Sequence, residues 1–299
     1  MRASAALLAA VVSATTVAGA THISSAATTV PPPYVLFPWL CLERCGDNAT
    51  AIASQVAQLA AHSPLFTATA FELYNLGPRS TLVVNNLTRV SAGIAAAGIP
   101  ARWAMLSSYP YPPQFLVYMR QVFAQPAPFI AACVAVLKAD PTITGFNVDW
   151  EPVEGKGAPT PTSADALAYA GFLDTFAKAL HAAGPYQLSV AVATWSPIWN
   201  LTAIGATDVD VVASMGTYTG GFTTWTRQLG ELLAAVPPSK AVVGLETTND
   251  DEGGRPFTTA ELKERFDALS SAGVRAVGIW RSPIPDNWWP FLRGLRRGE

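Results

Sequence analysis

The strongest constraint on the fold is a regular alternation of strand-like and helix-like segments through residues 34–299. Short apolar runs typical of buried strands occur eight times, at Tyr34–Leu40, Thr67–Tyr74, Arg102–Ser107, Ile143–Glu151, Gln187–Thr194, Asp208–Met215, Ala241–Thr247 and Arg275–Trp280. Segments with helical spacing alternate with them, at Ala49–Ala61, Leu87–Ala97, Phe115–Lys138, Ala164–Ala183, Thr223–Ala235, Thr259–Ala272 and Trp288–Arg296. A helix near 197–206 is poorly marked. Eight such units predict an α/β protein, a single-domain (β/α)8 TIM barrel.

The competing architecture is an open, doubly wound sheet. The count of eight favours closure into a barrel, and no glycine-rich dinucleotide-binding motif follows the first strand. The sequence also contains no internal repeat and no interdomain linker, so we expect one domain.

Residues before the first strand have the pattern of a secretion signal. Arg2 precedes the apolar run Ala5–Val12, and Ala18–Ala20 has the small-x-small form of a signal-peptidase site. This run is shorter than the roughly 20 apolar residues that span a bilayer. We therefore expect a signal peptide over 1–20, a lead segment over 21–33 and the barrel over 34–299, in a protein that is extracellular or in the secretory-pathway lumen.

Sequons and cysteines bear on the same compartment. The chain contains three N-x-Thr sequons, at Asn48, Asn86 and Asn200, which would make it a glycoprotein in a eukaryotic secretory pathway. Cys41 and Cys45 are near neighbours that could form a disulfide under oxidising conditions. Cys133 lies in an apolar stretch and is expected to be a buried free thiol. No Cys or His lies at ligand spacing from Cys41 and Cys45, so no metal site is expected.

Composition limits the classes of partner. The chain is 50% hydrophobic and only 13% charged, which is the reverse of a disordered sequence. Its 19 Lys and Arg do not outnumber its 21 Asp and Glu, so the basic surface of a nucleic-acid-binding domain is not expected. No segment after the N-terminus is long and apolar enough to span a membrane. We expect a monomer.

The most informative segment is Thr144–Pro152, which ends the fourth predicted strand. Because strand side chains alternate between faces, Asn147, Asp149 and Glu151 share one face, while the apolar residues between them share the other. In a barrel the apolar face would meet the helices. The polar face would line the interior and rise to the C-terminal rim, where barrel enzymes hold their active sites.

Such a polar column is costly unless it has a use. Barrel interiors are filled mostly by branched apolar side chains, and an unpaired buried charge costs several kcal/mol or becomes protonated. Two carboxyl groups two residues apart on one face favour protonation of one of them, and a carboxyl protonated near neutral pH can serve as a general acid. The plain structural alternative is a pair of rim carboxylates held by Lys or Arg from adjacent strands.

The segment resembles the D-G-x-D-x-D-x-E signature of glycoside hydrolase family 18, the chitinase-like (β/α)8 barrels. Gly145, Asp149 and Glu151 match the signature, whereas Asn147 and Thr144 replace its second and first Asp. The resemblance covers eight residues and falls on the strand where the family carries its motif. It identifies the chain as similar to a divergent member of that family.

The resemblance implies a retaining, substrate-assisted hydrolysis of β-linked N-acetylglucosamine, in chitin or chitooligosaccharides, with no cofactor and no metal. Glu151 would be the general acid and base, protonating the glycosidic oxygen while the 2-acetamido oxygen of the substrate attacks the anomeric carbon. Asp149 would orient the acetamido group, and Asn147 would support Asp149 through a hydrogen bond.

Later strand ends supply further candidates by the same resemblance. The family carries Met-x-Tyr-Asp on its sixth strand, and this chain has Met215 and Tyr218 with one extra residue before the Tyr and Thr219 in place of the Asp. Trp280 ends the eighth strand where the family has the Trp that floors a sugar subsite, since aromatic faces pack against the CH faces of sugars. Trp195 is a weaker subsite candidate, and the loop Tyr109–Pro113 could extend the cleft.

Two alternatives stay open at this stage. Glu246 ends the seventh strand, so Glu151 and Glu246 could be the acid/base and nucleophile of a two-glutamate retaining glycosidase if they lie about 5 Å apart. The departures at Thr144, Asn147 and Thr219 also fit a non-catalytic carbohydrate-binding protein on the same fold.

Overall fold

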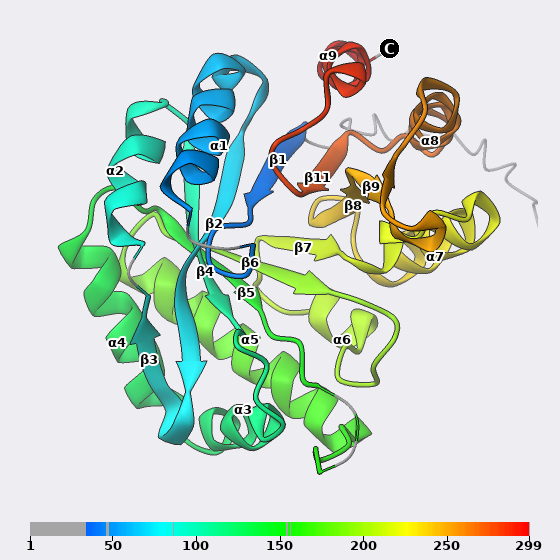
Figure 1. The fold of residues 1–299 in the computed structure, drawn as a ribbon. Helices are drawn as coiled ribbons and strands as arrows, with labels where there is room; N and C mark the ends of the chain where they lie inside the picture. The colour runs from blue at the N-terminus through cyan, green and yellow to red at the C-terminus, as the bar shows by residue number, and fades with distance from the viewer. Residues whose placement is uncertain (1–33, 46–47, 86, 154, 156, 299) are drawn as a thin grey trace, which may run out of the picture. The chain divides into compact units, whose positions relative to one another are not determined.

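A computed structural model of the chain describes residues 34–45, 48–85, 87–153, 155 and 157–298. The predicted signal peptide, the lead segment and the sequon residue Asn86 lie outside these residues. Eight parallel strands form a closed ring, because β1 pairs with both β11 and β2 (Figure 1). The strands are β1 (Val35–Leu40), β2 (Ala68–Gly77), β4 (Ala101–Ser107), β5 (Gly145–Asp149), β6 (Gln187–Val192), β7 (Val211–Ser214), β8 (Ala241–Glu246) and β11 (Ala276–Trp280). The predicted (β/α)8 barrel is confirmed.

Helices surround the ring and connect one strand to the next along the chain. They are α1 (Ala49–Ala61), α2 (Thr88–Ala96), α3 (Phe115–Ala124), α4 (Pro126–Ala139), α5 (Ser163–Ala183), α6 (Leu201–Gly205), α7 (Phe222–Ala235), α8 (Thr259–Ser271) and α9 (Trp289–Arg297). Side-chain caps mark where several begin: Asn48 accepts hydrogen bonds at the start of α1, and Thr162 with Asp165 forms a capping box on α5. The poorly marked sixth helix, α6, has only five residues.

One predicted helix was wrong. The expected continuous helix over Phe115–Lys138 is two helices, α3 and α4, which meet at an angle of 95°. Pro126 explains the break, since it has no N–H to donate and it disfavours helical backbone at Gln125. Among the described helices no single one has the length and apolar composition to cross a membrane, although α3 and α4 taken together have both.

Small strands that the sequence did not reveal decorate the barrel. The strand β3 (Thr81–Val84) pairs antiparallel with the far end of β2, which runs on past the ring. A two-residue pair, β9 (Thr248–Asn249) and β10 (Arg255–Pro256), forms a hairpin after β8.

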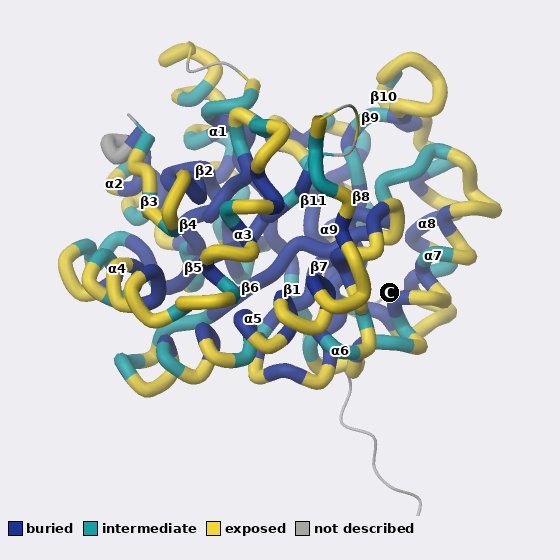
Figure 2. The backbone as a smooth tube through the Cα atoms, turned by 90° about the horizontal axis from the view of Figure 1, so that it is seen from below, coloured by how far each residue is buried: buried dark blue, intermediate teal, exposed yellow. Residues whose placement is uncertain are grey.

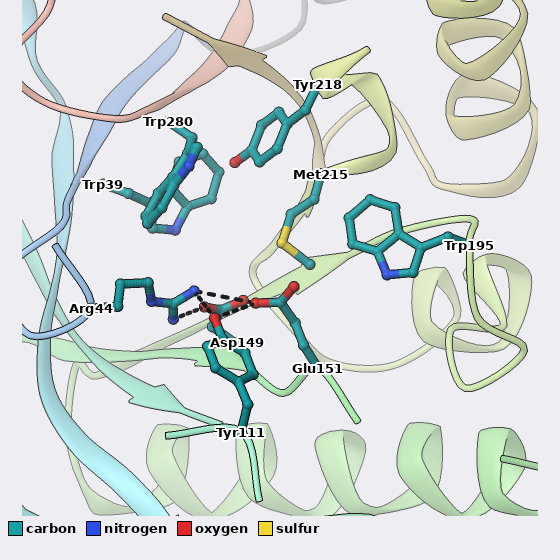
Figure 3. Close-up of a pocket in the computed structure, with 9 residues that line it drawn as sticks. All are labelled: Trp39, Arg44, Tyr111, Asp149, Glu151, Trp195, Met215, Tyr218 and Trp280. Carbon is teal, nitrogen blue, oxygen red and sulfur yellow. Dashed lines mark hydrogen bonds and ion pairs between the residues drawn. The ribbon is translucent and has the colours of Figure 1, made fainter. Parts of the chain in front are cut away.

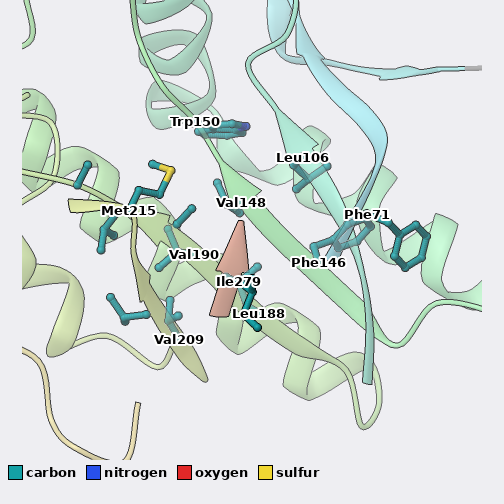
Figure 4. Packing of buried hydrophobic residues seen from close by; sticks show 14 of the residues in the cluster. Phe71, Leu106, Phe146, Val148, Trp150, Leu188, Val190, Val209, Met215 and Ile279 are labelled. Carbon is teal, nitrogen blue, oxygen red and sulfur yellow. The ribbon is translucent and has the colours of Figure 1, made fainter. Parts of the chain in front are cut away.

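The main core lies between the strands and the helices, as the burial colours of Figure 2 and the close-up in Figure 4 show. Phe146, Val148 and Trp150 on β5 and just after it face outward into this layer, as the alternation predicted. The Trp150 ring stacks on Phe172 of α5 with centroids 5.1 Å apart. Each such buried side chain contributes about 1.5–3 kcal/mol, so one face of β5 anchors the strand and leaves the other face for the site.

A second, smaller core fills the barrel interior. Phe37, Trp39 and Trp103 occupy most of it, and alanines on neighbouring strands leave them room. Gly278 on β11 serves the same purpose, because a Cβ there would come within 2.6 Å of the Trp39 ring. Above this aromatic layer the interior becomes polar.

Candidate active site

A cavity of about 240 Å³ opens at the C-terminal mouth of the barrel (Figure 3). Its walls come from loops and strand ends all around the ring: Trp39, Arg44, Tyr111, Asp149, Glu151, Trp195, Met215, Tyr218 and Trp280. Six of the seven site residues predicted from sequence are among them, and the exception is Asn147. Barrel enzymes carry their catalytic groups at this end of the strands.

Asn147 lies one step below the cavity and is held away from its expected partner. Its Oδ1 accepts a hydrogen bond from Nε1 of Trp39 at 3.1 Å, and its Nδ2 donates to Oγ of Ser189 at 2.9 Å. Within the described residues no hydrogen bond joins it to Asp149, so the predicted support of Asp149 by Asn147 was wrong. The physical reason is that Trp39 and Ser189 fix the orientation of the amide, so its Nδ2, the group that could donate to a carboxylate, donates to Ser189 instead.

Arg44 is the residue that organises the site, and the sequence analysis missed it. All five of its N–H groups have acceptors. Nε donates to Glu72 at 2.5 Å, Nη2 donates to Asp149 at 2.6 Å and to Oγ of Ser107 at 2.8 Å, and Nη1 donates to the Tyr111 hydroxyl at 2.5 Å and to Glu151 at 3.3 Å. One guanidinium therefore ties Glu72 on β2 to Asp149 and Glu151 at the end of β5. Figure 3 shows its contacts with Asp149, Glu151 and Tyr111.

A short loop after β1 presents Arg44 to the cavity. The disulfide between Cys41 and Cys45 closes this loop. Oε2 of the buried Glu72 accepts hydrogen bonds from the backbone N–H groups of Leu42, Glu43 and Arg44. The loop is therefore clamped both covalently and by a carboxylate from the neighbouring strand. Cys133, the other cysteine, is a buried free thiol as predicted.

Burial and charge set the protonation of Glu151. Desolvation and the nearby Asp149 carboxylate raise the pKa of Glu151 to about 7, and Arg44 and the Tyr111 hydroxyl act in the opposite direction. A glutamic acid with this pKa holds a proton near neutrality and can give it up, which are the properties of a general acid.

Asp149 offers an unused acceptor beside Glu151. Its Oδ2 is bound by Arg44, while its Oδ1 is buried and accepts no hydrogen bond from the residues described. A buried carboxylate oxygen without a donor is costly, and ligands commonly supply such a donor. Asp149 lines the cavity, so a bound molecule with an N–H group can donate a hydrogen bond to its Oδ1.

Aromatic rings form the walls of the cavity. Trp280 lies against the Arg44 guanidinium, with the Arg44 Cζ 5.3 Å from the ring centroid. Tyr218 stands edge-on to Trp39 with centroids 6.3 Å apart, and burial raises the pKa of its hydroxyl well above the ordinary value. Met215 lies between Tyr218 and Glu151 in the view of Figure 3, and Trp195 is 56% exposed at the rim. Tyr218 thus reaches the cavity despite the extra residue in its motif, because residues 216–218 form a single 3-10 turn.

Glu246 belongs to a different environment. It ends β8 but does not line the cavity. Burial and the neighbouring Asp250 raise its pKa to about 8, and the Arg281 charge lowers it. The pairing of Glu151 and Glu246 across one cavity, which a two-glutamate mechanism needs, is therefore not favoured.

Fold and site together define a (β/α)8 barrel with a carboxylate pair at the C-terminal end of its fourth ring strand. Solved structures similar to the chain include a chitinase from Chromobacterium violaceum, with 13% identity, 88% of this chain and 99% of that chain covered, and a TM-score of 0.69. The Group IV chitinase of Ostrinia furnacalis in complex with allosamidin shares 11% identity over 89% of this chain and 100% of its own, with a TM-score of 0.68.

A glycoside hydrolase family 18 N-acetylglucosaminidase from Paenibacillus barengoltzii is also similar, with 12% identity, 89% of this chain and 100% of that chain covered, and a TM-score of 0.60. No protein-family model matches the sequence, and no curated protein matches it. At 11–13% identity the likeness establishes a shared fold.

Proposed function

We propose that the protein is a glycosidase that hydrolyses β-linked N-acetylglucosamine in chitin or chitooligosaccharides. The observation that carries this proposal is the pairing of Glu151, whose pKa is about 7, with an Asp149 oxygen that is buried and lacks a donor, on one wall of an aromatic cavity. The similar structures that are described as chitinases and as a family 18 N-acetylglucosaminidase support it.

In the proposed first step Glu151 gives its proton to the glycosidic oxygen as the bond from that oxygen to the anomeric carbon breaks. The 2-acetamido oxygen of the same sugar forms the new bond to the anomeric carbon, which gives an oxazolinium ion. Oδ1 of Asp149 accepts the acetamido N–H and its negative charge offsets the charge that develops on the ring. The Tyr218 hydroxyl donates to the acetamido group, and Trp280 packs against the sugar face.

In the proposed second step water attacks the anomeric carbon of the oxazolinium ion. Glu151, now a carboxylate, takes one proton from that water, and the bond from the anomeric carbon to the acetamido oxygen breaks. The product sugar retains its configuration and Glu151 is protonated again, so the cycle closes without a cofactor.

We also propose that the protein is secreted and glycosylated. The Cys41–Cys45 disulfide supports this, since disulfides persist in oxidising compartments. The sequon residues Asn48 and Asn200 are both exposed helix caps, and in each the side-chain oxygen accepts the capping bonds. Detection of N-glycans on the protein recovered from culture medium tests this proposal, and an intracellular, unmodified protein would contradict it.

The mechanism is tested by comparing two fluorogenic substrates that differ only at carbon 2. Hydrolysis of the chitobioside, with no hydrolysis of the cellobioside that lacks the acetamido group, is the expected result. Equal hydrolysis of both would overturn substrate assistance. Chitin binding without hydrolysis of any N-acetylglucosamine substrate would instead establish a carbohydrate-binding protein.

A further inference from the structure

The family signature places an Asp where this chain has Asn147, so the strand lacks one ionisable partner for Asp149. Asn147 cannot turn toward Asp149 without giving up its bonds to Trp39 and Ser189. An amide also carries no charge. Any charged partner of Asp149 must therefore come from outside β5.

Arg44 occupies that role in the structure. Its side chain is only 12% exposed, and its Nη2 contacts Oδ2 of Asp149 at 2.6 Å while Nη1 contacts the Oε1 of Glu151 at 3.3 Å. A guanidinium is planar and always charged, so two contacts from one fork fix the relative position of both carboxyl groups. Because Arg44 takes Oδ2, it leaves Oδ1 of Asp149 free.

We propose that Arg44 is a positioning residue that holds Asp149 and Glu151 in their working geometry and replaces, from the β1–α1 loop, the partner that the Asn147 position lacks. This proposal rests on the proposed glycosidase function. Asp149 remains bound to Arg44 through both chemical steps, and it does not exchange partners with the residue below it on the strand.

The loop that carries Arg44 is built for such a role. Glu72 binds the Arg44 Nε and three backbone N–H groups of the loop, so it fixes both the side chain and the backbone. The disulfide closes the loop on either side of these contacts, and the second cysteine, Cys45, contacts the Arg281 guanidinium next to Trp280. These contacts limit how far Arg44 can move from the carboxylates.

Arg44 also acts on the proton of Glu151. Its charge lowers the pKa of Glu151, against the burial and the Asp149 carboxylate that raise it. Among the residues that the structure describes, the titratable groups that face Glu151 from the surrounding elements are Asp149 on β5, Arg44 after β1, Tyr111 after β4 and Tyr218 after β7. Arg44 is the one cation among them, so its removal raises the pKa of Glu151.

The test compares the wild type with Arg44→Met, Arg44→Lys and the matched surface variant Arg227→Met, whose arginine pairs with Glu231 on an exposed face of α7. For Arg44→Met we expect kcat/KM at pH 6 to fall about 100-fold. We also expect the alkaline limb of its pH–rate profile, the pH range in which kcat/KM falls as Glu151 loses its proton, to move up by about one to three pH units. Arg44→Lys keeps the charge, so its limb stays near that of the wild type while its rate falls about tenfold. Arg227→Met leaves both unchanged.

A second readout does not depend on activity. The Glu151 carboxyl carbon is followed by 13C NMR over pH 4–10, with Glu151→Gln used to assign its signal. Arg44→Met should titrate at higher pH than the wild type. An unchanged Glu151 titration in folded Arg44→Met would overturn the proposal, as would a wild-type rate in Arg44→Lys if Arg44→Met does not fold. If the wild type hydrolyses no substrate, the glycosidase function fails, while the NMR titration still decides the role of Arg44.

Discussion

Two glutamates at the mouth of the barrel have similarly raised pKa values but different surroundings. Glu151 has a pKa of about 7 and lies on the cavity wall, between a guanidinium, a tyrosine hydroxyl and a second carboxylate. Glu246 has a pKa of about 8 and lies beside Asp250 and Asp251, off the cavity. The difference teaches that burial and a neighbouring carboxylate are enough to raise a pKa, whereas a general acid also needs a place for substrate and neighbours that orient it.

The largest expected effect separates the two glutamates directly. Glu151→Gln should lower kcat/KM on a chitooligosaccharide by about 1,000-fold, because it removes the proton that the leaving group needs. Glu246→Gln should remain within about threefold of the wild type, because Glu246 does not line the cavity. Steady-state kinetics on the two purified variants measure this. Equal losses in both would favour a two-glutamate mechanism.

The pH dependence sharpens the assignment of Glu151. A general acid works only in its protonated form, and kcat/KM reports the pKa of the free enzyme. The wild type should therefore lose activity above about pH 7, approaching a tenfold fall for each further pH unit. The Glu246→Gln variant should keep the same limb. A limb near pH 8 that disappears in Glu246→Gln would assign the proton to Glu246 instead.

A similar comparison holds for two of the tryptophans that line the cavity, because Trp280 is half-buried whereas Trp195 is exposed at the rim. Trp280 contacts Arg44 and the cavity, so Trp280→Ala should lower kcat/KM about tenfold, equivalent to ~1.4 kcal/mol. Trp280→Phe should recover part of this loss. Trp195 is 56% exposed, and Trp195→Ala should change kcat/KM on a disaccharide substrate by less than about threefold. The reverse order of effects would place the sugar at the rim.

Most of the fold could be predicted because its signal is local. The β5 alternation placed Phe146 and Trp150 outward and Asp149 inward, and the structure agrees. Two features of the fold were not predicted, for different reasons. The break between α3 and α4 has a local signal, Pro126, whereas the four residues of β3 carry no clear pattern of their own.

The site was harder to predict because its organising residue depends on contacts far apart in sequence. Arg44 stands in a loop that only the Cys41–Cys45 spacing made notable, and Glu72, which fixes that loop, lies about thirty residues away. The bond from Trp39 to Asn147 spans 108 positions. A charged residue between two close cysteines, directly after the first strand, is the signal that could have found Arg44.

Removing the disulfide next to Arg44 should disturb the surroundings of Glu151 more mildly than replacing Arg44 itself. Replacing both Cys41 and Cys45 by Ser frees the loop, although Glu72 still binds its backbone. We expect kcat/KM to fall about three- to tenfold, with a small upward movement of the alkaline limb, measured by pH-rate profiles. Cys133→Ala, which alters the buried thiol away from the cavity, should leave the limb unchanged. An unaltered profile in the double Ser variant would show that Glu72 alone fixes Arg44.

The smallest expected effect concerns stability rather than rate, and it isolates Glu246. Its folded-state pKa of about 8 lies above the ordinary value of 4.5, so the folded protein binds the Glu246 proton more tightly than the unfolded chain does. Stability then falls as the pH rises from about 4.5 to about 8, because ionisation favours the unfolded state. Glu246 is partly exposed, so solvent screening reduces this penalty to ~1 kcal/mol. Glu246→Gln removes the penalty: its Tm should equal that of the wild type at pH 4.5 and exceed it by about 2–4 °C at pH 8.5. Differential scanning calorimetry at the two pH values measures the difference. A Tm difference that does not grow with pH would show that Glu246 is hydrated enough to ionise normally, and Glu151 would then be the only one of the pair with a raised pKa.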